Sequence, residues 1–167
     1  TTKPKTTENK NDLPVDHIRE SFLRSQEAFE YYYSSGVNTD ENQSYQPDEY
    51  SQIYYKVTDD IGTIDDLRDI LSDYFTDETC DMIIKDKYTE YNDELYFDTN
   101  THGFDCCYKV IDESVYKSGN GWIYELDTEI ISLGSVYDGN ETLQFYFEHS
   151  GSCYVFEMDD DVRLVEF

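Results

Sequence analysis

Apolar side chains recur with helical spacing in the N-terminal half of the chain, most clearly in residues 63–75, TIDDLRDILSDYF. Its apolar residues form one stripe of an α-helix: Ile64, Leu67, Ile70, Leu71 and Tyr74. Thr63 precedes the stripe and Asp66 follows three residues later, which is an N-terminal capping pattern. The pattern predicts a capped amphipathic helix with one solvent-exposed face.

The rest of this half is predicted from similar signals. The expected elements are a long helix over 15–35 that ends at Gly36, a polar loop over 37–49, a short strand over 51–57, and a third helix that Thr76 caps. The long helix has its own apolar stripe, formed by Ile18, Phe22, Phe29 and Tyr33.

After about residue 88 the pattern changes to short β-favouring runs separated by turn residues. The turn signals are Tyr91-Asn92-Asp93, Gly119-Asn120-Gly121, Asp138-Gly139-Asn140, Ser150-Gly151-Ser152 and Asp159-Asp160-Asp161. The surest strand pair is 142–149 with 152–158. Helices followed by strands predict an α+β fold, with N-terminal helices packed on a curved antiparallel β-sheet. This order resembles the cystatin-like or NTF2-like roll, an architecture that implies no function by itself.

The length of 167 residues favours one domain over 14–167, preceded by a flexible leader over 1–13. Residues 1–12, TTKPKTTENKND, contain no apolar side chain, and the chain begins without Met. Such a tether commonly separates a membrane or lipid anchor from an exported domain. We therefore expect an extracytoplasmic protein, either secreted or lipid-anchored at the cell surface, that is a monomer.

The net charge of the chain indicates which kinds of molecule it can bind. Twelve basic and 38 acidic residues give a formal net charge of −26. A field of this sign repels nucleic acid and attracts cationic proteins. We expect no nucleic-acid binding and a basic protein partner, although solubility alone also accounts for such a charge.

The candidate partner-binding residues are the acids that precede the 63–75 helix and line its wet side: Asp59, Asp60, Asp65, Asp66 and Asp69. Asp65 and Asp69 are four residues apart and share one helical face, so they repel each other modestly. A cationic partner would relieve this repulsion. Simple solvation of a helix face is the competing interpretation.

The four cysteines, Cys80, Cys106, Cys107 and Cys153, have no zinc spacing. Cys106 and Cys107 are adjacent on a predicted strand, so their side chains should point to opposite faces. One disulfide is possible in an exported protein, and four free thiols are the alternative.

The sequence provides no selective catalytic motif. His17, His102 and His149 all have a simple surface interpretation, and no base is paired with a nucleophile. The segment 98–103, DTNTHG, begins like a calcium loop but has Lys109 where a bidentate Glu is required. We expect a non-catalytic protein without cofactor or metal.

A family resemblance sharpens this expectation. The stretch YYKVTDDIGTIDDLRDILSDYFTDETCDMIIKDKY, preceded by a helix that ends in FEYYY, resembles the IseA-like DL-endopeptidase inhibitors of exported Gram-positive proteins. The resemblance covers about residues 15 to 90 and lies in the pattern of aromatic and acidic residues. It implies an extracytoplasmic inhibitor that binds cell-wall NlpC/P60 peptidases. It assigns no individual contact residues.

The alternative function is a small-molecule site or an enzyme in the concave pocket of a cystatin-like roll, within an envelope lipoprotein. Its walls would be formed by Tyr108, Trp122, Tyr124 and Tyr146. Plain core packing is the other interpretation of these rings.

Overall fold

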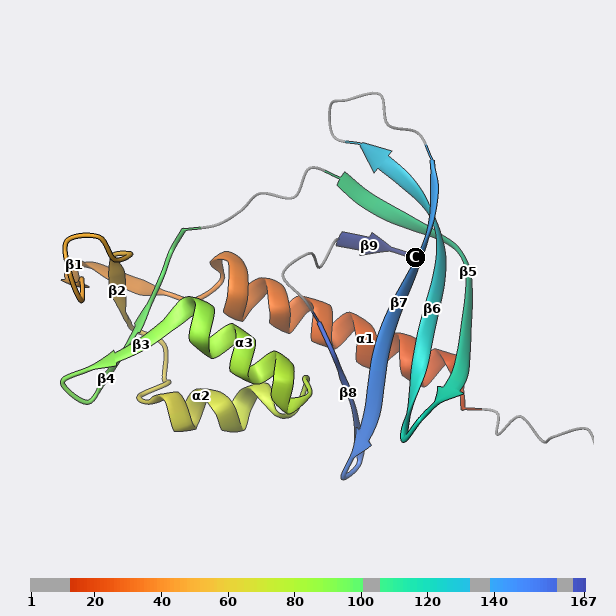
Figure 1. Ribbon diagram of the computed structural model, residues 1–167, viewed down its shortest axis with the longest axis horizontal. Helices are drawn as coiled ribbons and strands as arrows, with labels where there is room; N and C mark the ends of the chain where they lie inside the picture. Colours follow the sequence, from red (N-terminus) through yellow and green to blue (C-terminus); the bar gives the residue numbers. More distant parts are fainter. Residues whose placement is uncertain (1–12, 101–105, 133–138, 159–163) are drawn as a thin grey trace, which may run out of the picture.

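The computed structural model describes residues 13–100, 106–132, 139–158 and 164–167 (Figure 1). The elements are α1 Val15–Phe29, the π-helix η1 Glu30–Ser35, β1 Thr39–Tyr45, β2 Tyr54–Val57, α2 Ile64–Leu71, α3 Asp77–Lys87, β3 Tyr88–Tyr91, β4 Glu94–Phe97, β5 Cys106–Ser118, β6 Gly121–Ser132, β7 Asn140–Ser150, β8 Cys153–Phe156 and β9 Leu164–Glu166. The expected α+β class is confirmed: the helices pack with a curled, largely antiparallel sheet.

The long first helix is confirmed, with a change of helix type at its end. Ile18, Phe22 and Phe29 are buried along one stripe of α1, as the apolar spacing predicts. Beyond Phe29 the chain widens into the π-helix η1. The backbone N–H of Gly36 closes this segment by donating to the carbonyl of Tyr31 at 3.1 Å.

The two shorter helices also form where the pattern predicts them. The Thr63 hydroxyl accepts from the Asp66 backbone N–H at 3.1 Å, and the Asp66 carboxylate accepts from the Thr63 backbone N–H at 3.0 Å. This reciprocal pair is a capping box. Thr76 stands at the N-cap of α3, but its hydroxyl donates to Thr79 at 3.4 Å rather than accepting from the backbone.

The smaller sheet has the strand order β1-β2-β4-β3. The prediction of a loop over 37–49 is wrong, because this segment contains the edge strand β1. The segment TDENQSY has no apolar alternation because most of its side chains face water, and a bulge between Asp40 and Ser44 interrupts its pairing with β2. The β3–β4 turn is confirmed: Asn92 and Asp93 both have positive φ, 55° and 61°.

The larger sheet has the order β8-β7-β6-β5-β9. The expected β7–β8 pair and the turns at Gly119-Asn120 and Gly151-Ser152 are confirmed. The turn signal at 159–161 and most of that at 138–140 lie outside the described residues. The structure adds two features to the expected meander. The strands divide into two sheets, and β9 pairs with β5 in parallel.

The helix α1 runs between the two sheets, and the core follows it (Figure 1). Phe22 contacts the rings of Tyr124, Phe145 and Phe156 from the larger sheet, with centroids 4.6 to 5.5 Å apart. The α2–α3 connection joins the same sheet. Phe156 donates its N–H to the Tyr74 carbonyl at 2.9 Å and accepts from the Thr76 N–H at 3.2 Å.

Candidate functional site

Asp59, the first of the predicted partner-binding residues, is tied into the fold. Its carboxylate accepts from the Tyr31 hydroxyl at 2.9 Å, from the Asn38 backbone N–H at 3.0 Å and from the Asn38 side-chain amide at 2.7 Å. Burial raises the pKa of this carboxyl, but the hydrogen bonds from Asn38 and Tyr31 outweigh burial, so the pKa is lowered overall. Asp59 joins the π-helix to the start of β1.

Asp66 also has a structural role, because its carboxylate caps α2. Besides the backbone N–H of Thr63, it accepts from the Thr63 hydroxyl at 2.8 Å. The side chain is exposed, yet it satisfies groups at a helix N-terminus that otherwise have no intrahelical partner. Neither Asp59 nor Asp66 is a free carboxylate.

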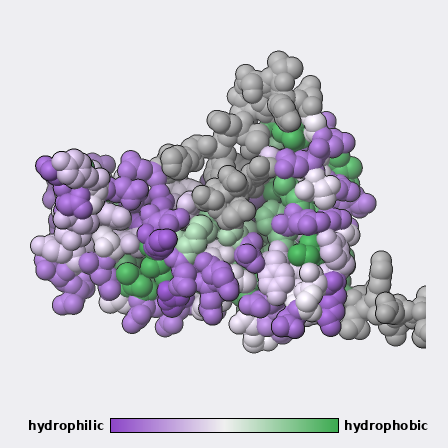
Figure 2. Space-filling model, viewed as in Figure 1, coloured by the Kyte–Doolittle hydropathy of each residue, from purple (hydrophilic) through white to green (hydrophobic). Residues whose placement is uncertain are grey.

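The other three predicted acids, Asp60, Asp65 and Asp69, are exposed to solvent. They belong to a longer series of exposed acids on α2, α3 and their flanks. We call this series the acidic face: Asp60, Asp65, Asp69, Asp73, Asp77, Glu78, Asp81 and Asp86. In Figure 2 the surface over α2 and α3 is hydrophilic around a small hydrophobic patch. Sequence reasoning missed the α3 members, although their position on a predicted helix was a usable signal.

Few cations oppose the acidic face. Arg68 of α2 pairs with Asp81 of α3 at 2.6 Å, and this ion pair joins the two helices. Of the other two cations on these helices, Lys85 is exposed and Lys87 is buried. Most carboxylates of the acidic face are therefore exposed and form no ion pair within the described part of the chain.

A different carboxylate, Glu113 of β5, is neutralised where α1 meets the larger sheet. It forms an ion pair with Arg19 of α1, whose Nε lies 3.2 Å from Oε2, and it accepts from the Tyr124 hydroxyl at 2.6 Å. The Arg19 guanidinium also lies 5.6 Å from the centroid of the Phe167 ring. Burial raises the pKa of Tyr124 to about 12, against the effect of Arg19. No sequence signal links these distant residues.

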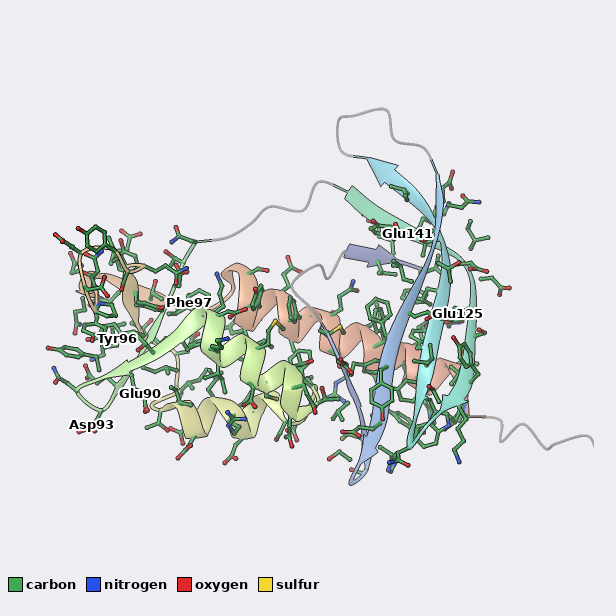
Figure 3. The ribbon with its side chains drawn as sticks, in the orientation of Figure 1. Glu90, Asp93, Tyr96, Phe97, Glu125 and Glu141 are labelled. Carbon is green, nitrogen blue, oxygen red and sulfur yellow. The ribbon has the colours of Figure 1, made fainter. Side chains whose placement is uncertain are left out.

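The outer face of the larger sheet, away from α1, carries a small polar network. The Gln144 amide donates to Glu125 at 2.6 Å and to the Tyr116 hydroxyl at 3.0 Å, and Tyr116 donates to Glu125 at 3.2 Å. Figure 3 labels Glu125 and Glu141 on this sheet, far from Glu90 on the smaller one. These hydrogen bonds join neighbouring strands β5, β6 and β7.

The smaller sheet has tyrosines on its outer face. Tyr45 stacks on Tyr91 with ring centroids 4.1 Å apart, and Tyr96 lies edge-on to both. At the opposite face, Glu90 of β3 accepts from the Ile64 backbone N–H at 3.3 Å, which links the sheet to the start of α2 (Figure 3).

The aromatic residues expected to wall a pocket do not share one face of the sheet. Tyr108 and Tyr124 are core residues, 3 % and 0 % exposed. In the β6–β7 register, Tyr124 pairs with Phe145 and Ile123 with Tyr146, so Tyr146 points to the opposite face from Tyr124. The ring of Phe22 packs where the concave pocket was expected.

Three of the four cysteines are described, and Cys80, Cys107 and Cys153 are free thiols. No two of these three form the expected disulfide, and the side chain of Cys106 lies outside the described residues. Burial raises the pKa of the Cys80 thiol to about 11, which disfavours the reactive thiolate. Within the described ranges, no group of three His, Cys, Asp or Glu side chains could hold a metal ion.

No protein-family model matches the chain, and comparison with curated proteins finds no match. Within the described part of the chain, none of the helices combines the length and apolar character that a membrane crossing requires.

Proposed function

We propose that this protein is a non-catalytic, extracytoplasmic binding module whose acidic face docks on a basic protein. The observation that carries the proposal is the acidic face itself. Its carboxylates come from two packed helices and their flanks, they are exposed, and Arg68–Asp81 is the ion pair among them in the described residues.

The physical argument rests on charge in water. Like charges three or four residues apart on a helix destabilise it by a few tenths of a kcal/mol per pair, and the whole chain carries −26. A partner with a basic surface would relieve that repulsion and would be steered toward the face before contact. Because such attraction is screened beyond about 8 Å at physiological ionic strength, affinity should fall as salt is added.

The proposed partner class is a cell-wall peptidoglycan hydrolase of the NlpC/P60 type. The resemblance of residues 15–90 to the IseA-like inhibitors supports this class, and so does the tether-like leader sequence. The protein would inhibit or regulate such an enzyme by covering it, as a monomer and without chemistry of its own.

The experiment is a calorimetric titration of the protein into purified NlpC/P60 hydrolases of its own host at low and at high salt. A hydrolase of the same class with an acidic surface is the control. We expect saturable binding of the basic enzyme at low salt, weaker binding at high salt, and none to the control. Absence of binding to every basic hydrolase at low salt would refute the proposal.

A further inference from the structure

A groove lies along α1, away from the large-sheet core. It has a volume of about 280 Å³ and is lined by Arg24, Glu27, Ala28, Tyr31, Tyr32 and Tyr74. A second hollow of about 80 Å³ shares Arg24 and Tyr74 and extends to Ser152, Cys153 and Tyr154 at the β7–β8 turn. The two hollows have Arg24 and Tyr74 in common, and we call the larger one the tyrosine groove.

The walls of the tyrosine groove are held by hydrogen bonds. The π-helix η1 presents Tyr31 and Tyr32 side by side, and π-helical turns frequently occur at functional sites. The Tyr31 hydroxyl is held by Asp59, and the Tyr32 carbonyl accepts from the Tyr88 hydroxyl at 2.6 Å. Gly36 is required behind this wall, because a Cβ there would clash with Tyr31.

The Tyr74 side of the groove is equally fixed. Its carbonyl accepts from the Ser25 hydroxyl at 3.0 Å as well as from Phe156, so helix α1 and the larger sheet both hold this residue. A groove whose walls are anchored in this way is preformed, which reduces the entropy lost when a ligand binds.

Two opposite charges face this groove without pairing. The Arg24 guanidinium lies 5.5 Å from the centroid of the Tyr74 ring. Glu27 lies three residues further along α1, a spacing at which ion pairs often form. Neither residue has an ion-pair partner in the described part of the chain. Ala28 adds a small apolar surface to the same lining.

We infer that the tyrosine groove binds a zwitterion, either a free amino acid or a short peptide with an apolar or aromatic side chain. The carboxylate pairs with Arg24, whose guanidinium suits bidentate binding. The ammonium pairs with Glu27, and the side chain packs on the rings of Tyr31, Tyr32 and Tyr74. The inference does not depend on the proposed partner.

Net charge selects the zwitterion over simpler ions. A ligand without net charge is not repelled at long range by a protein of charge −26, as an anion is. A pure cation would gain from Glu27 but would be repelled by Arg24 inside the groove. The volume, just below the usual range for drug-sized ligands, suits one or two residues.

The test uses three related ligands, titrated into the full chain at about pH 6, where the amines of phenylalanine and phenylalaninamide are protonated. They are phenylalanine, N-acetylphenylalanine, which lacks the ammonium charge, and phenylalaninamide, which lacks the carboxylate. We expect phenylalanine to bind at least about tenfold more tightly than either derivative, the loss typical of one charge-assisted hydrogen bond. NMR shifts should appear at groove residues. Equal affinities, or no binding, would overturn the inference.

Two variants test which groove residue binds the carboxylate of the ligand and which binds its ammonium group. Arg24→Gln should remove the preference for phenylalanine over phenylalaninamide and keep its preference over N-acetylphenylalanine. Glu27→Gln should have the reciprocal effect. Arg68→Gln, which removes an arginine outside the groove, should change neither preference. A carboxylate preference that survives Arg24→Gln would contradict the assignment.

A fourth ligand distinguishes a free amino acid from a short peptide as the natural ligand. Tighter binding of glycyl-phenylalanine than of phenylalanine assigns the groove to short peptides, and the reverse order assigns it to free amino acids. Both orders support a zwitterion site.

Discussion

Two regions of the molecule differ in how their carboxylates are paired and exposed. Where α1 packs on the larger sheet, Glu113 is mostly shielded from solvent and is matched by Arg19 and the Tyr124 hydroxyl. On α2, α3 and their flanks, the carboxylates of the acidic face are exposed, and most of them form no ion pair within the described residues. A buried carboxylate without a partner would strongly destabilise the fold, whereas an exposed one costs little. The fold therefore does not depend on the carboxylates of the acidic face, which leaves them available to bind a partner.

The largest effect is expected in the core on which the first region depends. Phe22 is 0 % exposed and contacts three rings of the larger sheet. Phe22→Ala should lower the free energy of unfolding by about 3–5 kcal/mol, because it removes buried apolar area and leaves a cavity. Urea denaturation measures this. Tyr50→Ala is the control, since that ring is 90 % exposed. Similar midpoints for the two variants would contradict the packing described.

The second-largest loss of stability is expected at Glu113, the carboxylate paired with Arg19. Glu113→Ala removes the acceptor of the buried Tyr124 hydroxyl and the partner of Arg19, so it should cost about 1–3 kcal/mol. Adding Tyr124→Phe, which removes the orphaned hydroxyl, should cost less in this background than in the wild-type protein. Strict additivity in the double-mutant cycle would mean that the two groups do not interact.

The next effect is expected at the N-terminal cap of α2, the helix that carries part of the acidic face. Thr63→Ala removes the hydroxyl that accepts from the Asp66 N–H, and should cost about 1 kcal/mol in urea denaturation. Thr63→Ser retains the hydroxyl and should stay close to the wild-type stability. A serine variant as unstable as the alanine variant would assign the effect to the methyl group instead.

A smaller and pH-dependent effect is expected at Asp59. Its pKa is lower in the folded state than in the unfolded chain, where it is about 3.9. Its contribution is therefore present above that value and is lost as pH falls through the lower, folded pKa. Asp59→Asn should flatten this part of the acid-denaturation profile by less than about 1 kcal/mol, because solvent screens the partly exposed site. An unchanged profile would mean that Asn38 and Tyr31 do not favour the charged form.

Local signals in the sequence account for the elements that were predicted correctly. The α2 stripe and its Thr63–Asp66 cap depend on neighbours within one helical turn, and the turn at Asn92-Asp93 needs residues that tolerate positive φ. Both are properties of a short segment. They can be read without knowing what the segment packs against.

The features that the sequence did not reveal depend on partners distant in the chain. The strand β1 is polar because it lies at an exposed sheet edge, so it lacks the expected alternation. The ion pair between Arg19 and Glu113 spans 94 positions. The tyrosine groove combines α1 and η1 with Tyr74, which comes after α2. The predicted acids were partly available: Asp60, Asp65 and Asp69 are exposed, while Asp59 and Asp66 are engaged in hydrogen bonds.

The central claim is that location, and not only net charge, makes the acidic face a docking surface. The triple variant Asp60→Asn, Asp65→Asn and Asp69→Asn should change stability by no more than about 0.5 kcal/mol per site. A control, Glu20→Gln, Glu129→Gln and Glu157→Gln, alters charge equally at exposed positions elsewhere. In stopped-flow mixing with a basic NlpC/P60 hydrolase, the first variant should associate more slowly and with a flatter salt dependence than the control. Equal association rates and salt slopes for the two variants would contradict the claim.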